Sequence, residues 1–161
     1  PIIAAVNGHA LAGGFEVAMK CDLVVAAENA RFGIPEVKRG LVAAGGGTRL
    51  PRRIPLQVAL EMGLTGEPIS AERARELGLV NRVVPLAELL DAALAAAQTI
   101  CAMSGPSVAL AKECVNRAFE APLAEGVLFE RRIFHALFAT EDQKEGMDAF
   151  VNKRAPVFKH R

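Results

Sequence analysis

The stretch Asn7-Gly-His-Ala-Leu-Ala-Gly-Gly-Phe-Glu16 carries the most information in this chain of 161 residues. Its Asn-Gly pair predicts a turn, and Gly13-Gly14 leads into a predicted helix that ends near Lys20. The backbone N–H groups at this helix start are open to a ligand, and the helix dipole favours negative charge there. Glu16 lies about one turn beyond Gly13, so its carboxylate can share the face to which the Gly13 N–H points. The turn is therefore a candidate oxyanion site, while close packing of a helix on a strand beside a solvated Glu16 is the commoner use of such glycines.

A second informative stretch is Phe32-Gly-Ile-Pro-Glu36. Pro35 stiffens the chain just before Glu36, and the apolar neighbours of Glu36 can desolvate its carboxyl group and raise its pKa. Glu16, near a helix N-terminus, is instead expected to stay ionised. Two carboxyl groups in opposed environments suit a division into acid and base. The alternative is a loop glutamate in an ordinary salt bridge.

Around these stretches the pattern predicts an α/β region, and a helical region follows it. The expected strands are residues 1–6, 22–27, 30–33 and 79–84. Residues 35–47 are expected to form a loop, and helices are expected over residues 56–64 and from the N-cap Ser70 onward. After Pro85 apolar residues recur at helical spacing to the end, with Thr140 and Gln143 as a capping box. The predicted division is 1–85 for the α/β core and 86–161 for the helices.

Composition narrows the class of protein. Hydrophobic residues make up 52% of the chain, and 19 basic against 18 acidic side chains give no reason to expect nucleic-acid binding. No apolar run is long enough to span a bilayer and no secretory signal opens the chain, so we expect a cytoplasmic protein without a membrane partner.

The three cysteines, Cys21, Cys101 and Cys114, are expected to be reduced and buried. None of the histidines has a partner at metal-ligand spacing, so no metal site is expected.

The start of the chain reads as the middle of a domain. The apolar run that follows Pro1 is typical of a buried strand, which needs neighbours on both sides. We therefore expect a further segment upstream of Pro1, and without it an exposed helix face that includes Val17 and Met19.

Together the motifs resemble the crotonase, or enoyl-CoA hydratase/isomerase, family. The matching segments run in order along the whole chain: residues 3–8, 12–16, 21–22, 32–36, 64–67, 74–80, 145–150 and 153–154. The resemblance implies a spiral of ββα turns, here partial with its N-terminal part absent, followed by a C-terminal all-helical region that forms trimers. It also implies a homotrimer or a hexamer of two trimers.

The resemblance further implies chemistry on an acyl-CoA thioester. Gly13 would supply one oxyanion-hole N–H for the thioester carbonyl. Glu16 and Glu36 would activate the water that adds to a 2-enoyl double bond, with Glu36 delivering the α-proton and Glu16 acting as the partner base. The expected substrate-binding residues are Gly14, Pro35 and Lys153. No cofactor is expected, because coenzyme A is part of the substrate.

The resemblance leads first to an enoyl-CoA hydratase of fatty-acid or related acyl-CoA degradation. A related acyl-CoA dehydratase or isomerase, of carnitinyl type for example, and an inactive oligomerising fragment are the alternatives. The family carries a segment before the position of Pro1 that supplies most of the CoA surface and the second oxyanion N–H. The loop 40–50 is one residue shorter than usual, with Ala43 where proline is frequent, so substrate length stays open. Ala12 replaces a common glycine.

Overall fold

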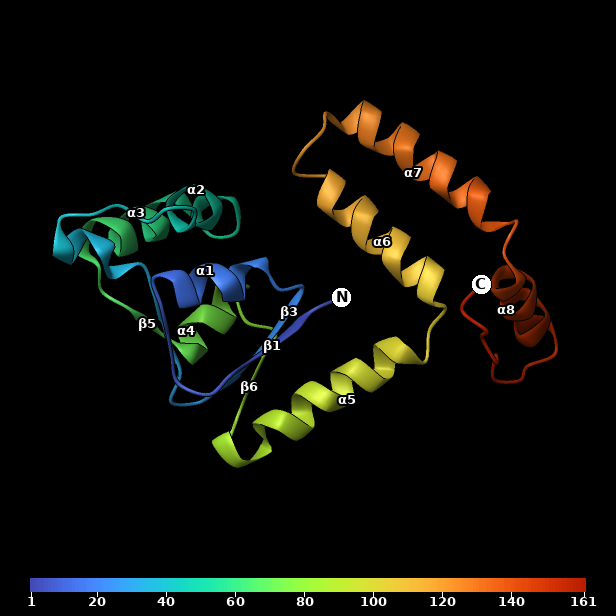
Figure 1. Ribbon diagram of the computed structural model, residues 1–161, viewed down its shortest axis with the longest axis horizontal. Helices are drawn as coiled ribbons and strands as arrows, with labels where there is room; N and C mark the ends of the chain where they lie inside the picture. Colours follow the sequence, from blue (N-terminus) through green and yellow to red (C-terminus); the bar gives the residue numbers. More distant parts are fainter. The chain divides into compact units, whose positions relative to one another are not determined.

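The strands form two small sheets in the computed structural model, which describes residues 1–161 (Figure 1). The first sheet is parallel and consists, in spatial order, of β1 (Ile3–Val6), β3 (Leu23–Ala27) and β6 (Arg82–Val84). The second consists of β2 (His9–Leu11), β4 (Arg31–Gly33) and β5 (Ile69–Ser70), with β2 parallel and β5 antiparallel to β4. Each ββ pair along the chain thus adds one strand to each sheet, as a ββα spiral requires.

Helices lie between and after the strands. They are α1 (Gly13–Lys20), the 3-10 helix η1 (Pro35–Arg39), α2 (Gly46–Arg49), η2 (Leu50–Arg52), α3 (Leu56–Thr65), α4 (Ala71–Glu76), η3 (Leu86–Glu88) and α5 (Leu89–Cys101). Ser70 caps α4 as predicted, because its hydroxyl oxygen accepts the N–H of Arg73. Residues 2–96 form one of two compact units, and residues 97–161, with Pro1, form the other.

The core of the first unit explains how its elements are fixed. The strand β3 is apolar throughout, and Val25, Ala26 and Ala27 are buried, as expected of a strand with neighbours on both edges. Phe15 of α1 and Phe32 of β4 are also buried, and their rings meet edge to face at 5.8 Å between centroids. Such a pair contributes about 0.5–1.5 kcal/mol beyond burial. It ties α1, which carries Glu16, to the strand that leads to Glu36.

The second unit is helical. It contains α6 (Gly105–Arg117), α7 (Leu123–Leu137) and α8 (Glu141–Val151), and α6 packs along α7 (Figure 1). Large apolar side chains on these helices are exposed, including Val115, Leu123, Val127, Phe134 and Phe150. No single helix of the chain combines the length and apolar character needed to cross a bilayer.

Hydrogen bonds and ion pairs hold the last residues of the chain against α8. The buried Asp142 accepts the N–H groups of Lys159 at 2.7 Å and His160 at 3.2 Å through Oδ1. Arg154 reaches Glu145 at 2.6 Å, and the Val157 N–H donates to the same carboxylate at 2.7 Å. The guanidinium of Arg154, followed by the Val157 N–H, lowers the pKa of Glu145 to about 2.

Some predicted elements need correction. The expected loop over residues 35–47 contains the 3-10 helix η1 and the first residues of α2, because Pro35 at the first position of a helix favours it. The short strands β2 and β5 were not predicted. Cys21 is buried, but Cys101 is exposed at the end of α5 and Cys114 is half-buried, and all three thiols are free.

Three further expectations can be compared with the structure. Val17 is exposed as predicted, but Met19 lies in the core at 3% exposure, because it faces the opposite side of α1. Thr140 caps α8 by accepting the N–H of Gln143 at 3.1 Å, while the side-chain oxygen of Gln143 finds no partner, so the capping box is only half formed. The two units divide between Ala96 and Ala97, inside α5, whose first half packs Leu89 and Ala93 under β3.

Candidate active site

The glycine turn opens α1 at the end of β2. Ala12 precedes it with φ 52° and ψ −126°, a conformation that L residues rarely adopt, and its N–H donates to the Gly33 carbonyl at 2.9 Å. A Cβ atom added at Gly13 or Gly14 would meet nothing within 4 Å, and both glycines are exposed. Their N–H groups have no preceding helical turn to bond to. The turn therefore presents N–H donors at the positive end of the α1 dipole.

Glu16 is held by a glycine far along the chain. Its Oε1 accepts the N–H of Gly46 at 2.9 Å, at the first residue of α2. Gly46 is buried, and a Cβ there would lie 3.3 Å from Glu16 Cγ and Oε1 and 3.1 Å from Ile34 Cγ2. The backbone at residue 46 thus approaches both the carboxylate of Glu16 and the residue that precedes Pro35. Only the absence of a side chain allows this approach.

Glu36 lies on the second segment of the site. Pro35 is the first residue of η1 and Glu36 the second, and Gly40, with φ 71°, ends this helix. Glu36 is half-buried, but its Oε2 is buried and has no hydrogen-bond partner within the chain. An unpartnered buried carboxylate oxygen is costly unless a ligand or a proton completes it. The salt bridge considered as the alternative role of Glu36 is not formed.

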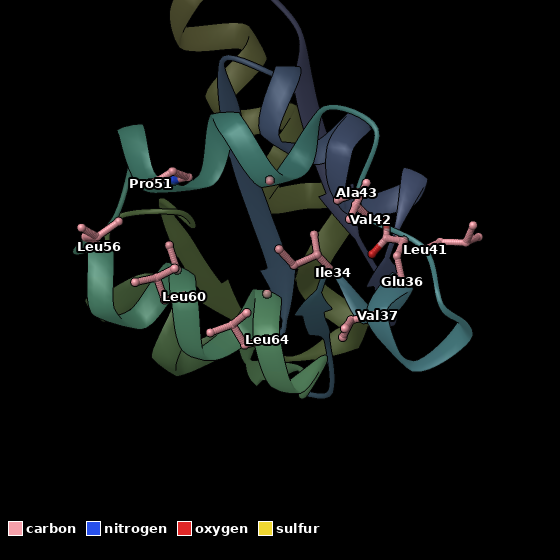
Figure 2. A pocket seen from close by; sticks show the side chains of 13 residues that line it. Ile34, Glu36, Val37, Leu41, Val42, Ala43, Pro51, Leu56, Leu60 and Leu64 are labelled. Atoms are coloured by element: carbon pink, nitrogen blue, oxygen red, sulfur yellow. The ribbon is translucent and has the colours of Figure 1, made fainter.

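An apolar pocket of about 290 Å³ adjoins Glu36. Figure 2 shows Leu56, Leu60 and Leu64 of α3 on one side of it, with Glu36 and Val37 on the other and Ile34 between them. The loop residues Leu41, Val42 and Ala43 add to the wall beside Glu36. Glu36 is the one ionisable group of the lining. We call this hollow the apolar pocket.

The α3 wall of this pocket was not predicted as part of a site. Leu56, Ala59, Leu60, Gly63 and Leu64 line it, and they recur at the i, i+3, i+4, i+7, i+8 spacing of one helix face. That spacing can be recognised in the sequence. It is also typical of a helix that faces a hydrophobic core, so the pattern alone did not distinguish a pocket wall from a core.

The remaining predicted residues fall in different places. Gly13, Gly14, Glu16, Pro35 and Glu36 all belong to the unit of residues 2–96. Lys153 follows α8 in the second unit, so its contact with substrate stays a prediction. No group of three or more His, Cys, Asp or Glu side chains is placed to hold a metal ion.

Comparisons with known proteins agree with this picture. The chain matches the enoyl-CoA hydratase/isomerase family over residues 1–161. It is 54% identical, over its whole length, to a probable enoyl-CoA hydratase of Mycobacterium tuberculosis, of which it covers 63%. It is 45% identical to the 2,3-dehydroadipyl-CoA hydratase of Escherichia coli, covering 64% of that protein.

Solved structures show the same fold. The crystal structure of an enoyl-CoA hydratase from Mycobacterium tuberculosis H37Rv matches with a TM-score of 0.95 and 46% identity, over 100% of this chain and 64% of that one. The chain therefore has the crotonase fold and spans a little under two thirds of the length of these relatives. Because the family match covers residues 1–161 and the relatives align over the whole of this chain, the chain belongs to the enoyl-CoA hydratase/isomerase family.

Proposed function

We propose that this chain carries the acid/base pair of an enoyl-CoA hydratase, which adds water reversibly to a 2-enoyl-CoA thioester. The observation that carries the proposal is the buried, unpartnered Oε2 of Glu36 at the wall of an apolar pocket. A structural glutamate would be paired or solvated, whereas a catalytic one leaves an oxygen for the substrate or its water. The hydratases among the relatives support the same reaction class.

In the proposed mechanism the Gly13 N–H donates to the thioester oxygen, where enolate-like charge develops. One such donor contributes roughly 2.7–4 kcal/mol to lowering the barrier. Glu16 takes a proton from the water whose oxygen bonds to the β-carbon, and Glu36 in its acid form gives a proton to the α-carbon. The electron pair of the double bond forms the new C–H bond by way of the enolate, and no redox partner is needed.

The geometry gives each glutamate a suitable support. Glu16 accepts the Gly46 N–H through Oε1 alone, so its other oxygen stays available to the water. Glu36 is set by Pro35 and by η1, so its carboxyl group is presented from a short rigid segment. A positioned acid or base accounts for about 10²–10⁴ in rate.

Assembly and CoA binding form a second part of the proposal. The exposed apolar side chains of α6, α7 and α8 support a homotrimer or a hexamer, because such patches are rare on monomers. Arg154, Lys159 and Arg161 are already engaged with acidic residues of α8. Lys153 has no ion pair, which supports it as the basic residue left for a CoA phosphate.

A panel of CoA thioesters tests the reaction class. The protein is prepared both as this chain and at the full length of its curated relatives, and each is given crotonyl-CoA, longer 2-enoyl-CoAs, a 3-enoyl-CoA and carnitinyl-CoA. We expect the full-length protein to hydrate 2-enoyl thioesters fastest. Preferred dehydration of carnitinyl-CoA, or isomerisation of the 3-enoyl thioester without hydration, would reassign it within the family. Full-length protein inert toward every thioester would favour a binding or oligomerising role.

A further inference from the structure

The α3 face of the apolar pocket contains one residue that does not fit its neighbours. Four of the five pocket-lining positions of α3 carry leucine or alanine, and the fifth is Gly63. Gly63 is thus the one position of this face that places no side chain in the pocket. The absence of a larger side chain there calls for a reason in its surroundings.

Backbone conformation does not supply that reason. The glycines with φ in the left-handed region are Gly40, Gly66 and Gly78, and Gly63 is not among them. Close packing does not supply it either. A Cβ at residue 63 would meet only Ile34 Cδ1, at 3.6 Å, which is an ordinary van der Waals contact. By contrast, a Cβ at Gly46 or Gly33 would meet neighbours at 3.1 Å.

The place of Gly63 suggests what its missing side chain provides. Ile34, whose Cδ1 atom a Cβ at residue 63 would touch, lies in the middle of the pocket between α3 and Glu36 (Figure 2). A side chain longer than alanine would therefore enter the apolar pocket, which Glu36 also lines. Leu56, Leu60 and Leu64 on the same face stay about half or more exposed, so the wall is apolar and open to an occupant.

We propose that Gly63 is a specificity-determining residue: it keeps the apolar pocket open for the part of the acyl chain that extends beyond the reacting carbons. This inference rests on the proposed function, because the reacting carbons are placed at Glu36. The occupant is a hydrocarbon chain, since Glu36 is the only ionisable group of the lining and nothing else in it would pair a charged tail. Each methylene buried in such a pocket raises affinity about fourfold.

The test uses saturated acyl-CoA thioesters, which bind without reacting. Dissociation constants of butanoyl-CoA and octanoyl-CoA are measured by titration calorimetry on the full-length protein and on its Gly63→Leu and Gly63→Ala variants. Gly63→Leu places an isobutyl group in the pocket, whereas Gly63→Ala adds only the Cβ that fits. We expect the preference for octanoyl-CoA to fall at least about tenfold in Gly63→Leu and to stay within about threefold in Gly63→Ala.

A second occluding variant guards against misfolding. Gly63→Met carries an unbranched side chain that adapts its shape, and thermal unfolding of each variant shows whether it is folded. An unchanged octanoyl preference in a folded Gly63→Leu or Gly63→Met variant would overturn the inference, as would an unaltered protein that binds both thioesters equally. Because binding needs no hydration, a protein that shows the predicted chain-length effect but hydrates no enoyl thioester would refute the proposed function alone.

Discussion

Replacing Gly46 by alanine tests how closely the site is built around Glu16. The added Cβ would lie 3.1 Å from Ile34 Cγ2 and 3.3 Å from both Cγ and Oε1 of Glu16. These contacts are too short by a few tenths of an ångström. Ile34 is buried at 4% exposure and cannot easily give way, so the strain falls on Glu16 and on the N–H bond at 2.9 Å that holds its carboxylate.

The size of the effect follows from that bond. A hydrogen bond to a charged group contributes about 1.5–3 kcal/mol, and loss of part of it in the transition state corresponds to roughly 10–100-fold in kcat. Displacement of a reacting group by about 1 Å has an effect of similar size. We therefore expect Gly46→Ala to lower kcat for crotonyl-CoA hydration by roughly 10–100-fold with a smaller change in KM.

The neighbouring glycine provides the matched control. A Cβ at Gly45 would lie 3.8–3.9 Å from the Glu16 carboxylate, which is an ordinary van der Waals contact. Gly45→Ala should stay within about threefold of the unaltered enzyme in kcat. Equal rates in the two variants, or a Gly46→Ala enzyme as fast as the unaltered one, would refute the role given to the Gly46 contact.

Two other predictions concern stability. Ala12→Gly should raise the free energy of unfolding, measured by chemical denaturation, by about 1 kcal/mol. The reason is that relief of about 1–3 kcal/mol of backbone strain at φ 52° exceeds the entropic cost of glycine. A lower free energy of unfolding in this variant would show that Ala12 is not strained. The pKa of Glu145, held at about 2 against a usual 4.5, means that its contribution to stability is complete above about pH 4.5 and is lost as the pH falls toward about 2. Glu145→Gln should therefore unfold at lower temperature than the unaltered chain at pH 7 and differ from it little near pH 2, and a constant difference across that range would contradict the assignment.

Much of the fold could be predicted from short apolar runs and glycines. The apolar runs at residues 1–6 and 22–27 predicted β1 and β3 correctly, because a short continuous apolar run is typical of a buried parallel strand. β2 and β5 span only three and two residues, too few for any periodicity to be visible. The 3-10 helix η1 was not predicted, because proline and glycine occur both in loops and at the ends of short helices.

The candidate site was predicted in part. The glycine turn, Glu16 and Glu36 stand out in sequence because glycines, a proline and carboxylates cluster around them. The Gly46 contact to Glu16 joins residues that lie 30 positions apart, and no local pattern reports such a pairing. The pocket wall on α3 was equally hidden, since its apolar spacing is also that of a core helix.

The most direct test of the central claim is the rate of crotonyl-CoA hydration by Glu36→Gln in the full-length protein, with binding of butanoyl-CoA measured alongside. Glutamine keeps the shape of the side chain but cannot deliver the α-proton, so turnover should fall by at least about 100-fold while binding stays within about threefold. Glu28→Gln, at an exposed position of the same unit, is the matched control and should hydrate at the unaltered rate. A Glu36→Gln enzyme that hydrates crotonyl-CoA as fast as this control would contradict the assignment of Glu36.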